Sequence, residues 1–274
     1  MKVTVLLENT ACSEEIRAAH GLSLYLETPA HRILFDMGPN AAFAENAQTL
    51  GVDLEGVDIA FLSHGHYDHA GGLDLFCRRN SAAKIYMHPG ALGSYWSTGR
   101  GEPRYIGVDP AGRAHRDRFV LCGDGQVIDG ELRVFSDIRT ADYPTSANLS
   151  LKERTEEELR PDPFLHEMDL LVTAEGKTVL VAGCAHRGVV NILRRAEELL
   201  GRSPDYLFSG FHLYNPATGQ PEPEELLRAV AEELAARPTR YFTGHCTGEA
   251  AFSVLKERLG DQLSYMGGGM TFAL

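Results

Sequence analysis

The spacing of apolar and polar positions divides the chain into short strands and helical segments. Alternating or unbroken apolar runs predict strands at residues 2–8, 22–27, 32–36, 59–62, 84–87, 126–128, 132–135, 169–173, 178–182, 206–208 and 240–243. Apolar positions with helical spacing predict helices at residues 40–50, 73–77, 189–200, 223–236 and 249–259. Strand clusters therefore alternate with helices in two successive halves, with no linker between them. This order fits an α/β or α+β domain in which helices cover the outer faces of two stacked sheets.

Two stretches interrupt this pattern. Residues 89–125 are dominated by glycine, arginine, proline and aromatic residues, which predicts a long excursion with little regular structure. Loops of that length in a domain are usually functional or mobile. Residues 152–160 form a charged run that predicts a solvated helix or loop. We expect a single domain over residues 1–274, with a lid-like excursion at about residues 89–125.

The densest group of reactive side chains follows the predicted strand at residues 59–62. His64, His66, Asp68 and His69 lie on a tight loop between that strand and a helix. Four such groups cannot all be satisfied as ordinary buried polar side chains. Imidazole nitrogens and a carboxylate at one place suit a cation such as Zn²⁺ or Fe. The alternative is a solvated polar loop that holds three histidines without a shared role.

Three later histidines repeat one local pattern. His186, His212 and His245 each come shortly after a predicted strand, with glycine close by. Glycine lets the backbone turn sharply and approach a ligand, and strand ends collect along the rim of a fold, where sites form. A single histidine of this kind is as often structural as functional. The shared context favours metal binding by all three.

These residues carry a family resemblance. The pattern His64-x-His66-x-Asp68-His69 resembles the signature of the metallo-β-lactamase-fold superfamily. More narrowly, the chain is similar to metal-dependent hydrolases of the dihydropterin ribofuranosyl-aminobenzene-phosphate synthase-like group. Five segments carry that similarity, in the expected order over nearly the whole chain: His20–Ser23, Leu34–Gly38, Gly183–His186, Gly210–Leu213 and Gly244–Gly248. The resemblance implies an α+β fold, the four-layer αβ/βα sandwich, with metal at the open edge between its sheets.

The resemblance also implies roles for individual residues. The first metal ion is bound by His64 and His66, and the second by Asp68, His69 and His245. Asp36 resembles the early aspartate that supports the metal loop without binding the ions. Its alternative role is to form the turn before Gly38.

The middle of the pattern departs from the common superfamily form. Many members place a metal-bridging aspartate after a later strand, but the corresponding segment here holds Cys184 and His186 and no aspartate. Cys184 could replace the bridging carboxylate, since a thiolate binds metal and a nearby cation lowers the thiol pKa. Alternatively, Cys184 only packs while His186 binds. We expect His186 and His212 to be ligands, and the number of ions, one or two, stays open.

Metal-bound water explains the expected chemistry. Divalent cations lower the pKa of bound water and polarise the substrate oxygen, so a hydroxide can attack an ester, amide or phosphoryl centre. Asp68 would orient that water and accept its proton. We expect a hydrolase of an ester, phosphoester or related bond, with two divalent ions, Zn²⁺ first and Fe or Mn as alternatives.

Residues near the expected excursion could contact the substrate. Arg100 and Arg104 could hold a phosphate or carboxylate through paired donors. Trp96 could stack on a flat ring, and His20 lies near a matched segment. These residues point to a small, anionic substrate. The alternative is a solvated loop whose aromatic residues fill their own small core.

Composition excludes several partners. The formal net charge of −12 argues against a broad nucleic-acid surface. No apolar run is long enough for a transmembrane helix, and the first residues lack a signal-peptide pattern, so we expect a cytoplasmic protein without membrane contact. The five cysteines are odd in number and scattered, which indicates reduced thiols. Cys246, beside His245, is expected to be buried rather than nucleophilic, and the oligomeric state stays open.

Two other functions fit the same motif. One is an iron-dependent oxidoreductase acting on O₂ or a thiol. Flavodiiron relatives, however, carry an extra flavin-binding domain that this chain has no room for, and they usually place a glutamate at the position of His66. The other is a non-catalytic ligand-binding protein that keeps a metal site, which the missing bridging aspartate would allow.

Overall fold

Two stacked β-sheets form the centre of the computed structural model, which describes residues 1–274. The strands of the first sheet are β1 (Lys2–Leu7), β2 (Ser23–Glu27), β3 (Arg32–Phe35), β4 (Ile59–Leu62), β5 (Lys84–Met87), β8 (Phe119–Leu121) and β19 (Thr271–Ala273). Their order in the sheet is β19-β1-β2-β3-β4-β5-β8. From β3 to β8 neighbouring strands run parallel.

The second sheet supplies most of the later part of the chain. Its strands are β9 (Leu132–Phe135), β12 (Asp169–Ala174), β13 (Lys177–Val181), β14 (Tyr206–Gly210), β17 (Arg240–Gly244) and β18 (Leu263–Tyr265). Their order is β18-β17-β14-β13-β12-β9, and the neighbours from β13 to β18 are parallel. The carboxyl ends of β13, β14 and β17 therefore lie side by side at one edge.

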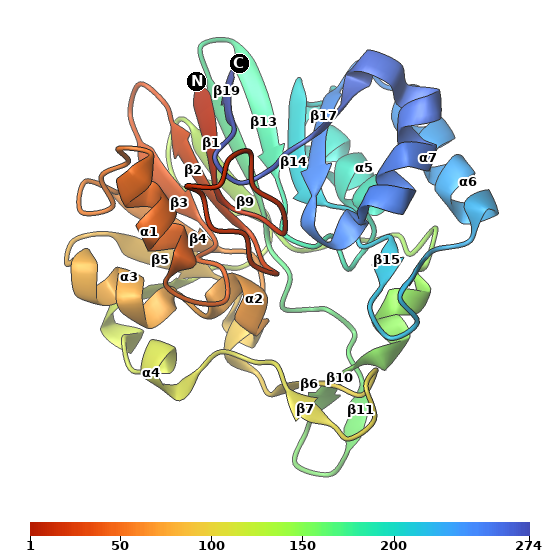
Figure 1. Ribbon diagram of the computed structural model, residues 1–274. Helices are drawn as coiled ribbons and strands as arrows, with labels where there is room; N and C mark the ends of the chain where they lie inside the picture. Colours follow the sequence, from red (N-terminus) through yellow and green to blue (C-terminus); the bar gives the residue numbers. More distant parts are fainter.

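Helices cover the outer face of each sheet, as the sequence predicts (Figure 1). The first sheet is covered by α1 (Ala42–Thr49), α2 (Tyr67–Ala70) and α3 (Leu73–Arg79), and the second by α5 (Val189–Leu200), α6 (Glu224–Ala235) and α7 (Glu249–Leu259). The side chains of strand β4 alternate between two apolar cores. Ile59 and Phe61 pack between the sheets, whereas Ala60 and Leu62 pack under the helices. Both faces of each sheet are thus buried, and the fold is a four-layer α+β sandwich.

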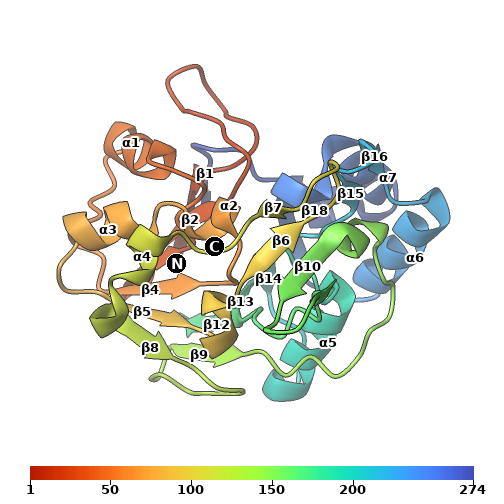
Figure 2. The ribbon, with the colours of Figure 1, turned by 90° about the horizontal axis from the view of Figure 1, so that it is seen from below.

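A third, small sheet lies at the end of the molecule opposite the two chain termini (Figures 1 and 2). It consists of β6 (Tyr95–Ser97), β7 (Arg104–Tyr105), β10 (Leu151–Arg154) and β11 (Leu159–Pro161), in the order β11-β10-β6-β7. Four buried side chains form its core: Tyr95, Ile106, Leu151 and Phe164.

Two predictions differ from the structure. Little regular structure was expected at residues 89–125, but this stretch holds the short elements β6, β7, α4 (Pro110–Arg113) and β8. Residues 152–160 are neither helix nor simple loop, since they belong largely to the β10–β11 hairpin. Strands β6 (Tyr95–Ser97) and β10 (Leu151–Arg154) are short and hold few apolar residues, so neither has a local apolar pattern, and they meet only through pairing across a long stretch of chain.

Other boundaries follow the prediction closely, with few exceptions. The predicted strand at residues 126–128 is only a single bridge between Val127 and Arg133, and β18 and β19 were not predicted. The remaining short elements are β15 (Tyr214–Asn215), β16 (Gln220–Pro221) and 3₁₀ helices at Pro89–Leu92, Arg116–Arg118, Ser146–Ser150, His245–Thr247 and Gly260–Gln262. No helix has both the length and the apolar character needed to cross a membrane.

The side chain of Asn80 ties the end of α3 to the segment before β4. Its Nδ2 donates to the carbonyl oxygens of Leu54 and Val57 at 3.0 and 2.8 Å, and its Oδ1 accepts from the N–H groups of Ala82 and Ala83 at 3.0 and 2.8 Å. Asn80 is buried, so water cannot replace these bonds after truncation.

We therefore expect Asn80→Ala to lower the free energy of unfolding by about 3 kcal/mol. Urea denaturation followed by circular dichroism measures this. The control is Gln48→Ala on the exposed side of α1, which should change the value by less than about 0.5 kcal/mol. Equal stability of the two variants would contradict the role given to Asn80.

Candidate metal centre

The candidate ligands from both sheets follow the ends of strands that meet at one edge of the sandwich. Strand β4 leads into the loop that carries His64 and His66, and α2 carries Asp68 and His69. From the second sheet, Cys184 and His186 follow β13, His212 follows β14 and His245 follows β17. All these side chains are buried.

The backbone around this edge contains several left-handed residues other than glycine. Their φ angles are 59° at Asp36, 55° at Ala185 and 51° at both His212 and His245. Such residues are uncommon, and they cluster at functional sites because the surrounding structure must hold them in place. Here the left-handed turns occur beside or at predicted site residues.

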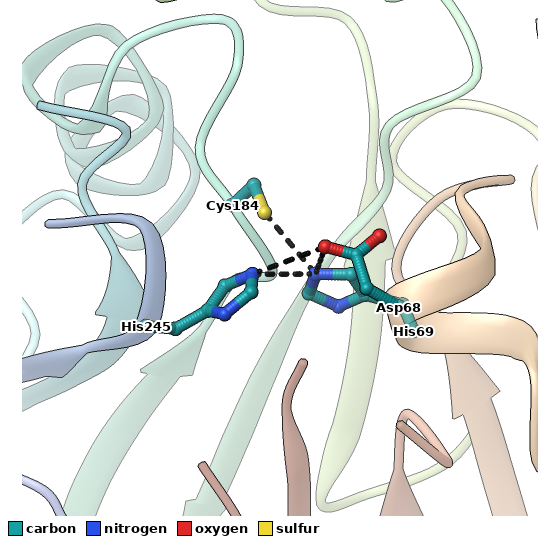
Figure 3. A group of neighbouring side chains, drawn as sticks. All are labelled: Asp68, His69, Cys184 and His245. Atoms are coloured by element: carbon teal, nitrogen blue, oxygen red, sulfur yellow. Dashed lines mark hydrogen bonds and ion pairs between the residues drawn. The ribbon is translucent and has the colours of Figure 1, made fainter. Parts of the chain in front are cut away.

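One group of donors consists of Asp68, His69, Cys184 and His245, whose side chains point toward one another (Figure 3). The Nε2 atom of His69 lies 3.3 Å from Nε2 of His245 and 3.1 Å from Sγ of Cys184. The Oδ2 atom of Asp68 lies 3.4 Å from Nε2 of His245. The group thus offers nitrogen, oxygen and sulfur donors to one point.

A second group consists of His64, Cys184 and His186. The Nε2 atoms of His64 and His186 lie 3.3 Å apart. The ring of His66 stands beside both, with centroids 4.6 Å from His64 and 4.9 Å from His186. Cys184 belongs to both groups, so its thiol lies between them.

Hydrogen bonds fix the proton of His69 and of His245 on Nδ1. The Nδ1–H of His69 donates to Oδ2 of Asp36 at 2.6 Å. The Nδ1–H of His245 donates to Oδ1 of Asn9 at 2.9 Å, while Nδ2 of Asn9 donates to the carbonyl oxygen of His245 at 3.2 Å. The second bond orients the Asn9 amide. In the neutral rings, both Nε2 atoms therefore present lone pairs to each other.

The same arrangement holds His64 and His186. Ser63 Oγ donates to Asp36 Oδ2 at 2.7 Å and so accepts from Nδ1–H of His64 at 2.8 Å. Asn148 donates through Nδ2 to the carbonyl oxygen of His186 at 2.8 Å, which leaves its Oδ1 to accept from Nδ1–H of His186 at 3.1 Å. The unprotonated Nε2 atoms of His64 and His186 therefore also direct their lone pairs toward each other.

Facing lone pairs cannot hydrogen-bond to each other, but a cation satisfies both. Two imidazole nitrogens bound to one tetrahedral Zn²⁺, each at about 2.0–2.1 Å, lie roughly 3.3 Å apart. Both Nε2 pairs have that separation. Outer partners that hold the Nδ1 proton are also what metal-binding histidines usually have. The residues present therefore fit divalent metal ions.

The charges of the group favour a cation. Burial and the neighbouring histidines keep the pKa values of His64 and His186 well below their usual range, so both rings are neutral. Burial alone would raise the pKa of Asp68, but His69 and His245 hold it well below its usual range. The pKa of His245 is raised to about 9, against the effect of burial, by Cys246 and Asp68. When no cation is bound, a proton on His245 offsets the negative charge of Asp68.

Asp162 and His166 form a neighbouring pair that the sequence did not single out. The N–H of Gly65 donates to Nδ1 of His166 at 3.1 Å, so Nε2–H of His166 donates to Asp162 Oδ2 at 3.1 Å. Both nitrogens of His166 are thus engaged. The Oδ2 atom of Asp162 also lies 3.8 Å from Nε2 of His66 and can orient that ring.

A glycine lets the two sheets meet at the metal loop. A Cβ atom on Gly183 would lie 2.3 Å from Oγ of Ser63 and 3.1 Å from Nδ1 of His64. Any larger residue would push the β13 end away from the loop after β4, and Cys184 and His186 would move with it.

The ring of His212 lies beside the second group, with its centroid 4.2 Å from that of His186, but its nitrogens do not join that group. It is grouped with Cys184 and Cys246 instead, and neither of its ring nitrogens has a hydrogen-bond partner although the residue is buried.

The donors open into a cavity of about 350 Å³. Three of the expected substrate-contacting residues line it: His20, Arg100 and Arg104. Trp96 does not line it; its ring lies under the guanidinium of Arg154, and its Nε1–H donates to Ser94 Oγ.

The orienting residues Asn9, Asn148 and Asp162 are the functional candidates that sequence reasoning missed. Asn148 and Asp162 stand in no local sequence pattern that points to a metal site. Asn9 directly follows the first strand, which is a position where site residues often lie.

The layered fold, with a cluster of candidate metal donors at the edge between the sheets, is that of the metallo-β-lactamase type. The family model of the metallo-beta-lactamase superfamily matches residues 17–245, and the chain belongs to this superfamily.

Individual relatives agree with this assignment. An uncharacterized protein of Methanocaldococcus jannaschii is 26% identical over 93% of this chain and 94% of its own length. The 7,8-dihydropterin-6-methyl-4-(beta-D-ribofuranosyl)-aminobenzene-5'-phosphate synthase of the same organism is 25% identical over 98% of this chain and 95% of its own. The narrower resemblance seen in the sequence is thereby confirmed.

Solved structures show the same fold. A metal-dependent hydrolase of the beta-lactamase superfamily, Tm1679, superposes with a TM-score of 0.81 and 24% identity, covering 100% of this chain and 99% of the other.

Removing the carboxylate that holds the metal loop tests this geometry. Asp36 accepts from Ser63 and His69, so we expect Asp36→Asn to weaken zinc binding by about 10- to 100-fold. Competition with a chromophoric chelator measures the affinity. The exposed Asp261→Asn should bind zinc like the unmodified protein. Unchanged zinc affinity in folded Asp36→Asn would contradict the role of Asp36.

Proposed function

We propose that the chain is a hydrolase that uses two divalent metal ions to cleave an ester, phosphoester or related bond in a small anionic substrate. The observation that carries this proposal is the pair of facing Nε2 contacts on either side of Cys184. Two separate contacts of this kind support two ions. The superfamily and the metal-dependent hydrolase among its structural neighbours support the reaction class.

The first ion position takes His64, His66 and His186, and the second takes Asp68, His69 and His245. Cys184 lies between them, at the position where the superfamily resemblance implies a bridging aspartate. The mixture of nitrogen, oxygen and sulfur donors favours Zn²⁺ over harder cations. When bound, the ions supply Lewis acidity and an activated water.

Asp68 handles the proton in this proposal. Its carboxylate stays ionised, lines the cavity, and directs Oδ2 toward both His245 and His20, with Nε2 of each 3.4 Å away. A carboxylate in this place can orient the attacking water and accept its proton. His20, whose side chain is half exposed, contacts the substrate from the same wall.

Arginines on the small sheet and its loop favour an anionic substrate. Arg100 and Arg104 line the cavity together with Glu102, and the guanidinium of Arg104 lies 5.3 Å over the ring of Tyr67. Guanidinium groups bind phosphate and carboxylate through paired donors. In a chain of net charge −12, two arginines facing a metal centre attract an anion to that place. The synthase relative has a 5'-phosphate in its name, which agrees with a phosphate-bearing substrate.

The first test of the hydrolase is turnover by the zinc-loaded protein on a panel of p-nitrophenyl esters, phosphomonoesters and phosphodiesters. Asp68→Asn should lower kcat by at least about 100-fold on any substrate that is cleaved. Asp261→Asn should keep the full rate. Firmly bound metal without turnover on the whole panel would contradict hydrolysis and favour a non-catalytic metal-containing binding protein.

The second test concerns the charge of the substrate. Arg104→Ala should raise KM for a phosphate ester by about tenfold, because it removes a charged hydrogen bond to the anion. The KM for an uncharged acetate ester should stay the same. Arg79→Ala, an exposed arginine on α3, is the matched control. Equal loss for charged and uncharged esters would show that Arg104 does not select for charge.

A further inference from the structure

Two thiols and one imidazole form a third group beside the histidine positions. Sγ of Cys184, Sγ of Cys246 and a ring nitrogen of His212 all lie within 4.8 Å of one another. The exposed fractions of the three residues are 3%, 7% and 6%. All three also line the cavity, so a small ion can reach them from solvent.

His212 is the residue that needs an explanation. Both of its ring nitrogens are buried and lack a hydrogen-bond partner, whereas the rings of His69, His186 and His245 are each tied to an outer partner. An unpaired buried imidazole costs free energy. Its left-handed backbone, with φ of 51°, adds to that cost. A ligand on the imidazole would offset both.

The backbone near Cys246 is shaped to admit its thiol. A Cβ atom on Gly210 would lie 2.5 Å from Sγ of Cys246, so only glycine leaves room there. The thiol donates a hydrogen bond to the carbonyl oxygen of Cys184 at 3.4 Å, which leaves the sulfur lone pairs free for a cation.

We propose that Cys184, Cys246 and His212 bind a soft cation such as Zn²⁺, Cd²⁺ or Cu⁺ at a thiol-rich position distinct from the two histidine positions. Two sulfurs and one nitrogen are the donor set that such cations prefer. Each thiol loses its proton to solvent when it binds. Because Cys184 also belongs to both histidine groups, a soft cation here competes with them for its sulfur. This inference does not depend on hydrolysis.

Cd²⁺ is the probe, because X-ray absorption at its edge counts the sulfur atoms bound to it. One equivalent of Cd²⁺ is added to the full chain after metal has been removed with a chelator. We expect two sulfurs per Cd²⁺ in the unmodified protein and one in Cys246→Ser. Cys122→Ser, which changes another buried cysteine in the core between the sheets, should keep two. One sulfur or none in the unmodified protein would overturn the proposal.

A second variant alters no donor. Gly210→Ala places a methyl group against Sγ of Cys246 and should weaken Cd²⁺ binding at least tenfold in a chelator competition. Gly123→Ala is the control, since a Cβ atom there meets nothing within 4 Å. Equal Cd²⁺ affinity of the two variants would count against the thiol-rich position. This measurement also decides the matter if Cys246→Ser does not fold, which circular dichroism shows.

The two proposals can fail separately. Two sulfurs per Cd²⁺ without hydrolysis by the zinc-loaded protein would remove the hydrolase and leave the soft-cation position. Hydrolysis together with a single sulfur per Cd²⁺ would remove the soft-cation position and leave the hydrolase.

Discussion

The structure of the site depends on where four histidines carry their protons. Asp36 accepts from Nδ1–H of His69 directly, and it orients Ser63, which accepts from Nδ1–H of His64. Two asparagines do the same for His186 and His245. Each asparagine also bonds the carbonyl oxygen of its own histidine, so its amide cannot turn over without losing two contacts. The outcome is two places where Nε2 atoms of two histidines face each other at a separation that suits a bound metal ion.

This constraint requires both halves of the sandwich. The first sheet supplies the metal loop, and the second supplies Cys184, His186 and His245 at the ends of adjacent parallel strands. The orienting partners cross the halves as well, because Asn9 follows β1 but holds His245 after β17. Neither half alone can form the site, so the site is complete only when the sheets have packed. The close approach at Gly183 is one place where that packing is enforced.

The sequence predicted the parts of this structure that have a local signature. Helices α5 and α7 and strands β4, β5 and β9 begin and end where the apolar pattern predicts, because each helix packs one face, and each strand both faces, against apolar residues. The candidate ligands were found for a different reason: histidines after strands stand out in any chain. The small sheet was missed because β6 and β10 are paired by contacts distant in sequence. Asn9 and Asn148 were missed because an orienting asparagine looks like any loop asparagine until its histidine is placed beside it.

The central claim is that the two facing Nε2 pairs are metal positions. Anomalous diffraction at the zinc edge from crystals of the zinc-loaded protein tests it most directly. We expect one peak about 2.0–2.1 Å from Nε2 of both His69 and His245, and another at the same distance from Nε2 of His64 and His186. Zinc bound elsewhere in the molecule, with both Nε2 pairs free of metal, would contradict it.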